Sequence, residues 1–118
     1  MPVTTRGSVP IAYTDRGGGE PALLLMPGWC ANRTMFDEIV EPLAERRRVL
    51  ALDWRGHGES APHQRDFGEE ELVADARAVI DGARVRSVIP VAVAHSGWVA
   101  IELRRRLGGA VPAIVSID

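Results

Sequence analysis

The stretch Ala92-Val93-Ala94-His95-Ser96-Gly97-Trp98 joins an apolar run, residues 87–91, to a helical pattern over residues 99–107. A buried strand, a sharp turn of small residues and a helix, in this order, are typical of a nucleophile elbow. Such a turn needs small side chains beside its tip, because the backbone there is strained and a neighbouring strand passes close. The stretch therefore predicts a strand–turn–helix unit that presents one residue at the end of a sheet.

The usual elbow pattern, Gly-x-Ser-x-Gly, is spelled in neither of the two registers that this stretch allows. With Ser96 at the tip, Trp98 occupies a position that requires a small residue and would crowd the turn. With Ala94 at the tip, small residues occupy every tight position, so we favour this register. It leaves no nucleophile at the tip, and Ser96 is a catalytic candidate in the alternative register.

Composition and charge exclude several classes of protein. Apolar residues make up 46% of the 118 residues, which excludes a disordered chain. The net charge of −2 indicates neither a nucleic-acid partner nor an anionic membrane surface. A single cysteine, Cys30, forms no internal disulfide, and no apolar run approaches the ~20 residues of a membrane span. Without a signal-peptide pattern either, we expect a cytoplasmic protein with no membrane partner.

Apolar runs and helical patterns alternate along the rest of the chain. Strands are predicted at 9–14, 22–26, 49–53, 87–91 and 113–117, and helices at 36–43, 66–83 and 99–107. This alternation predicts the α/β class, with a mostly parallel sheet and flanking helices. The carboxyl ends of such strands meet at one crevice. There we expect Trp29, Asp53, His95 and Asp118 to lie close together.

Two further segments resemble the α/β-hydrolase superfamily. Residues 53–60 are similar to its Asp-x-Arg-Gly-x-Gly-x-Ser loop, and residues 26–29 to the loop after the third strand that supplies one oxyanion-hole amide. The resemblance implies an α/β-hydrolase-like fold. It also implies that residues 1–118 are the amino-terminal part of a single domain, without the carboxyl-terminal strands and the cap.

A narrower resemblance is to the cofactor-independent 2,4-dioxygenases of 1H-3-hydroxy-4-oxoquinolines and quinaldines. Those enzymes keep the hydrolase fold but cleave a ring with dioxygen and release carbon monoxide. The match covers their amino-terminal half and sets Ala94 on the family's elbow serine. The matching residues are 24–30, 54–58, 66–68, 89–95, Gly97, Trp98 and Glu102.

This resemblance implies an oxyanion hole made by the backbone N–H groups of Trp29 and His95, with a small aromatic substrate between them. It also implies that Asp118 orients a general-base histidine, which in those enzymes lies far downstream of residue 118. We therefore expect the 118-residue chain to lack turnover by itself. No cofactor is implied, and no His, Cys or Asp cluster has the spacing of metal ligands.

Other assignments of single residues are structural. His57 lies in a loop whose usual role is structural, and His63 lies in a polar connection. We expect Trp98 to pack in the core at a helix start and Cys30 to be a small buried residue.

Two alternative functions remain open. The first is a serine hydrolase that uses Ser96 on an ester, although it too lacks a downstream histidine. The second is a non-catalytic half-domain that self-associates or binds a partner, because a sheet cut after the predicted strand at 113–117 exposes an edge. The sequence does not name a substrate.

Overall fold

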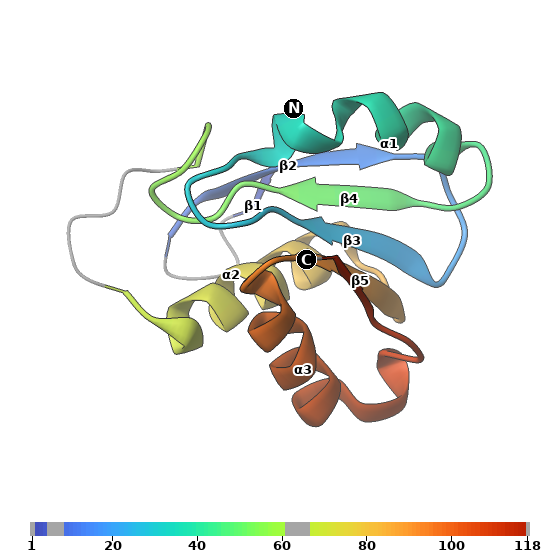
Figure 1. Cartoon of the computed structure of the whole chain (residues 1–118). Helices are drawn as coiled ribbons and strands as arrows, with labels where there is room; N and C mark the ends of the chain where they lie inside the picture. The colour runs from blue at the N-terminus through green and yellow to red at the C-terminus, as the bar shows by residue number, and fades with distance from the viewer. Residues whose placement is uncertain (1, 5–8, 61–66, 118) are drawn as a thin grey trace.

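The computed structural model describes residues 2–4, 9–60 and 67–117, so Asp118 and His63 lie outside the described residues. Six strands and three α-helices alternate along these residues (Figure 1). The strands are β1 (Val3–Thr4), β2 (Ile11–Arg16), β3 (Ala22–Met26), β4 (Val49–Leu52), β5 (Val88–Val93) and β6 (Val115–Ile117). The helices are α1 (Asp37–Ala44), α2 (Glu69–Ala83) and α3 (Ser96–Leu107), with short 3₁₀ helices at Arg33–Phe36 and Gly108–Ala110.

The strands form one sheet in the order β1-β2-β4-β3-β5-β6. β4, β3, β5 and β6 run parallel, whereas β1 and β2 pair in the antiparallel sense. The predicted α/β class and mostly parallel sheet are therefore confirmed. The two-residue strand β1 was not predicted, because a segment this short carries no periodicity.

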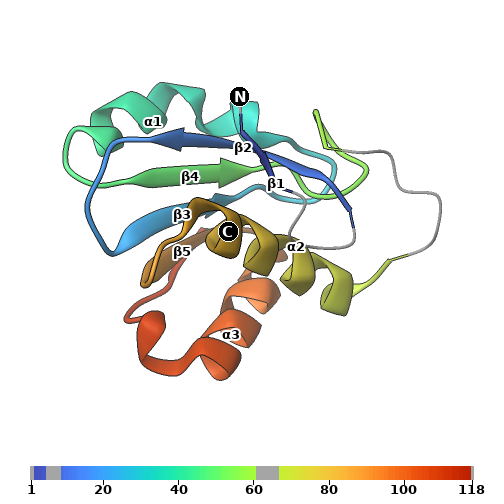
Figure 2. The ribbon, with the colours of Figure 1, turned by 180° about the vertical axis from the view of Figure 1, so that it is seen from behind.

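Helices cover both faces of the sheet (Figures 1 and 2). α2 and α3 pack on one face, where the larger core cluster includes Leu24, Leu50, Val79 and Leu103. α1 packs on the other face over a smaller cluster that includes Leu25 and Val40. Strands buried on both faces explain why the sequence of β3 and β4 reads as continuous apolar runs instead of alternating ones.

Helix α2 begins at Glu69 with Gly68 as its N-cap; Asp66, whose spacing from Glu69 resembles a capping box, lies outside the described residues. The backbone N–H of Gly68 donates to the Glu71 carboxylate at 2.7 Å, which satisfies one N-terminal donor of the helix. Glu69, Glu70 and Glu71 fill its first turn, where the helix dipole favours acidic side chains.

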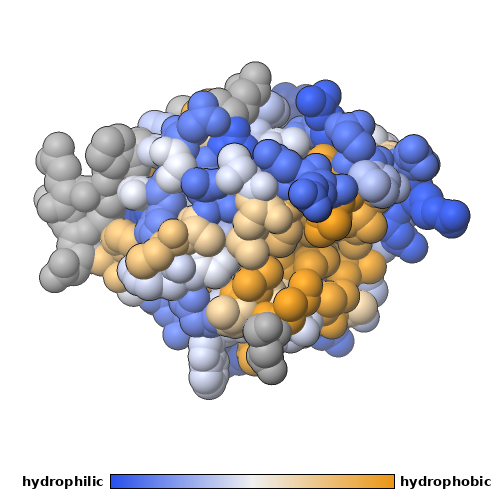
Figure 3. All heavy atoms as spheres, turned by 45° about the horizontal axis from the view of Figure 1, so that its top comes forward, coloured by the Kyte–Doolittle hydropathy of each residue, from blue (hydrophilic) through white to orange (hydrophobic). Residues whose placement is uncertain are grey.

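Strand β6 leaves one side of the molecule apolar and exposed. Its second edge pairs with no strand among the described residues. Val115 and Ile117 are 44% and 45% exposed, and Ile114 before them is also exposed. Figure 3 shows a continuous apolar patch on one face of the molecule.

Candidate active site

The elbow turns at Ala94. Its φ of 52° lies in the left-handed region, which costs an L-residue energy and marks the tip of the turn. The Ala94 N–H donates to the Ile117 carbonyl of β6 at 2.7 Å, and the Gly97 N–H donates to the Ala94 carbonyl at 3.1 Å. Helix α3 then begins at Ser96. The backbone thus has the geometry of the register with Ala94 at the tip, which presents a methyl group where a nucleophile would stand.

Ser96 is fully buried two residues beyond the tip. Its hydroxyl donates to the Pro27 carbonyl at 2.5 Å. A serine nucleophile must reach the substrate from the tip of the turn. Ser96 therefore occupies the place of the second glycine in the elbow pattern, and its hydroxyl contacts backbone instead of solvent.

The loop after β3 lies directly against the elbow. A Cβ added to Gly28 would stand 3.6 Å from the Val93 side chain and 3.7 Å from that of Ala94. The indole Nε1–H of Trp54 donates to the Pro27 carbonyl at 2.9 Å. Trp29, which follows Gly28 in this loop, is 52% exposed at the rim of the site.

Trp29 is the centre of an aromatic cluster. Its ring centroid lies 5.3 Å from that of His95 in an edge-on arrangement. The rings of His57 and Phe67 lie 5.1 Å and 5.6 Å from it and are tilted. Aromatic rings at such separations attract one another, because the positive edge of one ring faces the negative face of another. Three segments far apart in sequence therefore meet at Trp29.

Beside this cluster lies a pocket of about 270 Å³, whose lining is mostly apolar. The buried Nε2 atom of His95 has no hydrogen-bond partner among the described residues. A flat ring system with a few polar atoms suits such a pocket, which is apolar apart from isolated polar groups. The pocket is lined by Trp29, Phe67, Gly68, Glu69, Leu72, His95, Trp98 and Val99.

Among the hydrogen bonds between backbone groups in the described turns and loops, none is donated by the N–H of Trp29 or His95. Two such donors on neighbouring loops can stabilise a negative charge that develops on a bound oxygen.

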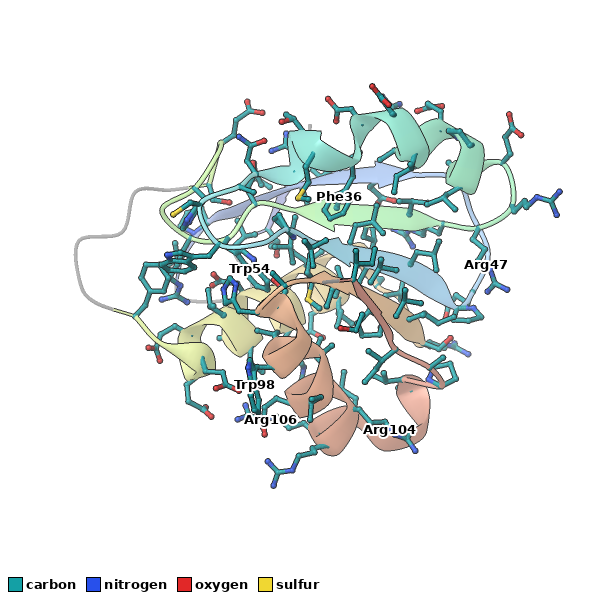
Figure 4. The ribbon with its side chains drawn as sticks, viewed as in Figure 1. Phe36, Arg47, Trp54, Trp98, Arg104 and Arg106 are labelled. Carbon is teal, nitrogen blue, oxygen red and sulfur yellow. The ribbon has the colours of Figure 1, made fainter. Side chains whose placement is uncertain are left out.

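Two structural expectations are wrong. Trp98 does not pack in the core: it lies in the first turn of α3 with 65% of its surface exposed, whereas Trp54 lies inside the molecule (Figure 4). Cys30 is exposed and has a φ of 64°. The sequence placed both residues after the end of a strand, but it did not show that the turns there direct their side chains outward.

Residues 53–60, which we call the scaffold loop, fold around a buried carboxylate. Asp53 accepts backbone N–H bonds from Arg33 at 2.7 Å and Glu59 at 2.9 Å, and its carboxylate also pairs with the Arg33 guanidinium. Gly58 has a φ of 51°, and a Cβ there would stand 2.3 Å from the Asp53 carboxylate. Glycine is therefore required at this position.

A second buried ion pair joins the scaffold loop to α2. The Arg55 guanidinium donates to the Asp75 carboxylate at 3.0 and 2.7 Å, and both side chains are buried. His57 is held by a contact of 3.0 Å between its Nδ1 and the Arg55 carbonyl. The acidic residue at the end of β4, Asp53, thus has a structural place, although the sequence grouped it with the site residues.

The described residues contain no group of three or more His, Cys, Asp and Glu side chains that could hold a metal ion. None of their helices combines the length and apolar character that crossing a membrane requires.

Comparison with known proteins identifies the family. The model of the alpha/beta hydrolase family matches residues 23–118. The chain belongs to this family.

Relatives of this chain include ring-cleaving dioxygenases. A 2-heptyl-3-hydroxy-4-quinolone dioxygenase of Rhodococcus erythropolis is 39% identical over 97% of this chain, and a 1H-3-hydroxy-4-oxoquinoline 2,4-dioxygenase of Pseudomonas putida is 33% identical over 92%. A solved structure described by its recognition and ring cleavage of the Pseudomonas quinolone signal superposes with a TM-score of 0.92, at 34% identity over 99% of this chain. The chain spans 44%, 42% and 46% of these proteins, respectively.

Proposed function

We propose that this chain supplies the oxyanion hole and part of the substrate pocket of a cofactor-free dioxygenase that cleaves the ring of 3-hydroxy-4-quinolones. In this proposal residues 1–118 are the amino-terminal part of a single domain. The quinolone ring lies in the pocket beside Trp29, and the N–H groups of Trp29 and His95 bind the oxygen that carries the negative charge. Asp118 orients a general-base histidine from outside the 118 residues.

The chemistry requires a base and an anion site. Removal of the 3-hydroxyl proton gives an anion that two backbone donors stabilise, and the electron-rich ring then reacts with dioxygen. Two ring C–C bonds break, and the carbon between them leaves with its own oxygen as carbon monoxide. The two atoms of dioxygen end on the two carbons that flanked it, so no external reductant is needed.

The observation that carries this proposal is the alanine at the elbow tip. Ester hydrolysis in this fold needs a nucleophile there, whereas proton abstraction and reaction with dioxygen do not. The pocket beside Trp29 and the identity of 33–39% with quinolone dioxygenases support the same function.

The test joins residues 1–118 to the remaining carboxyl-terminal part of the Rhodococcus relative. We expect the resulting chimera to release carbon monoxide from 2-heptyl-3-hydroxy-4-quinolone, and the 118-residue chain alone to release none. Asp118→Asn in the chimera should reduce the rate by at least about 10²-fold, because the base loses its orientation. A folded chimera that releases no carbon monoxide would contradict the proposal.

The serine-hydrolase alternative conflicts with the position of Ser96, whose hydroxyl is buried against Pro27. We expect a fluorophosphonate probe to leave Ser96 unlabelled in the folded chain. Labelling of Ser96 that disappears in the variant Ser96→Ala would revive this alternative.

A second candidate, self-association of the 118-residue chain, is favoured by the exposed apolar strand β6. Unpaired strand edges and large apolar patches promote pairing between chains. Ile117→Lys would place a charge on this edge, and we expect it to lower the fraction of dimer measured by sedimentation. The control is Ile39→Lys, because Ile39 is 43% exposed and lies on α1, away from β6. A monomer at all concentrations would exclude this candidate.

A further inference from the structure

We propose that Ser96 and Trp54 are positioning residues that together lock the Pro27 carbonyl and so hold the N–H of Trp29 beside that of His95. The inference rests on the proposed oxyanion hole. It assigns a role to the serine that the elbow pattern made a candidate nucleophile.

Two side-chain donors meet on one carbonyl oxygen. The Ser96 hydroxyl lies 2.5 Å and the Trp54 indole nitrogen 2.9 Å from the oxygen of Pro27, and Ser96, Trp54 and Pro27 are buried. The donors come from α3 and from the end of β4, while Pro27 follows β3. This carbonyl therefore connects the ends of three neighbouring strands, because α3 begins directly after β5.

Both lone pairs of the Pro27 oxygen are used. A carbonyl accepts at most two hydrogen bonds in this way, and a proline has no N–H of its own and a nearly fixed φ. Rotating this peptide plane would leave two buried donors unsatisfied, each at the cost of its desolvation. The loop can thus not reorient locally, and Trp29 stands only two residues further along.

The elbow pattern explains why Ser96 stands out. The position two residues beyond the tip ordinarily carries glycine, which contributes no side-chain bond. Here a hydroxyl fills that place and reaches across to the neighbouring loop. Ala94 carries no hydroxyl at the tip, whereas the hydroxyl of Ser96 faces the backbone of the oxyanion-hole loop.

Position matters at such a site because donors stabilise a charge only at defined distances. Donor groups act at 2.7–3.1 Å from the developing oxyanion, and a displacement of about 1 Å can cost about 10²-fold in rate. Loss of the Ser96 hydroxyl would remove no group that lines the pocket but would free the Trp29 amide to move. Turnover should then fall while substrate binding stays nearly constant.

The first experiment needs no activity. In the 118-residue chain we would measure backbone amide order parameters of Gly28 and Trp29 by nitrogen-15 relaxation. We expect values of about 0.85 in the native chain and below about 0.6 in Ser96→Ala. Thr4→Val is the matched control, because the buried Thr4 hydroxyl also donates to a backbone carbonyl, that of Ala78 at 3.1 Å, away from the site. Unchanged order parameters in Ser96→Ala would overturn the inference.

The second experiment uses the chimera described above. Ser96→Ala should lower kcat by about 10²-fold and change KM by less than about threefold, whereas Thr4→Val should change neither. Trp54→Phe removes the other donor, keeps most of the ring, and should act in the same direction as Ser96→Ala. A rise in KM of about 10²-fold with no change in kcat would contradict a positioning role.

The two proposals fail in different ways. A chimera without any dioxygenase activity would reject the proposed function, while the order parameters would still decide whether Ser96 holds the loop. An active chimera in which Ser96→Ala changes neither kcat nor the order parameters would reject the Ser96 inference and leave the dioxygenase function standing.

Discussion

The scaffold loop and the rim of the pocket lie at the same end of the sheet but use their polar groups in opposite ways. In the scaffold loop, Asp53 and Arg55 are buried and bonded to charged partners and backbone amides. At the rim, Trp29 is half exposed, and His95 has a buried ring nitrogen without a partner among the described residues. Bonded charges hold a loop in one conformation, whereas unused polar groups remain available for a ligand.

The comparison separates motif residues that build the fold from those that bind. The scaffold loop and the loop that carries Trp29 both belong to motifs of the α/β-hydrolase family, and the sequence placed both at the crevice. Hydrogen-bond satisfaction distinguishes them, so substitutions in the scaffold loop should affect stability and substitutions at the rim should affect binding.

Breaking the buried ion pair should have the largest effect. Asp75→Asn leaves the Arg55 guanidinium buried without its counter-charge, and we expect the free energy of unfolding to fall by about 3–5 kcal/mol. Chemical denaturation followed by circular dichroism measures this change. The control, Glu102→Gln, removes the surface ion pairs with Arg105 and Arg106 and should change the midpoint far less. Similar unfolding midpoints for the two variants would show that the buried ion pair contributes no more to stability than the surface ion pairs.

Gly58→Ala should be the next most damaging substitution. The new methyl group would collide with the Asp53 carboxylate, and the residue would keep a left-handed φ. We expect a loss of about 3 kcal/mol, part of it from the backbone and part from displaced hydrogen bonds. Gly109→Ala is the matched control, because nothing lies within 4 Å of a Cβ there. Equal stability of both variants would show that the scaffold loop adapts without cost.

At the rim, Trp29→Ala should reduce binding with little loss of stability. The indole contacts three rings and walls the pocket, so we expect the affinity for 2-heptyl-3-hydroxy-4-quinolone to fall by about 30-fold, or ~2 kcal/mol. Calorimetric titration of the chimera measures it. Ile101→Ala, at 50% exposure on α3, removes a comparably exposed apolar side chain outside the pocket lining and should bind normally. A lowered unfolding midpoint with unchanged affinity would assign Trp29 to the scaffold instead.

The smallest effect is expected at alkaline pH. Burial, and after it the negative charge of Asp15, raises the pKa of Tyr13 above its ordinary value, although Arg48 opposes this. Stability that depends on the neutral phenol is complete below the unfolded pKa of about 10 and is lost as the pH rises through the folded pKa. Tyr13→Phe should therefore lose less stability over this range.

The chain has one tyrosine and no lysine, so no other tyrosine or lysine side chain titrates in this pH range. The ultraviolet absorbance of tyrosinate in the folded chain should appear at higher pH than in the same chain in urea. If Tyr13 ionised at the same pH in the folded and the unfolded chain, its phenol would be open to solvent in the folded chain.

The sequence could predict which residues follow the ends of the strands, but not the directions of their side chains. Trp29 and His95 were placed at the crevice, because both follow apolar runs that become parallel strands. The outward directions of Trp98 and Cys30 were missed, since local sequence does not show how a turn leaves the end of a strand. The role of Asp53 was missed because its partner Arg33 lies 20 residues away.

Apolar periodicity was sufficient for the class of fold and for the order of the strands and helices after β1, because burial in a two-faced parallel sheet imposes a pattern on each segment separately. The conformation of the elbow depended on the folded molecule. Ala94 takes the left-handed tip where its N–H meets the carbonyl of Ile117, and Ser96 turns inward to Pro27, 69 residues earlier in the chain. Such contacts arise from packing between distant segments, so no local pattern contains them.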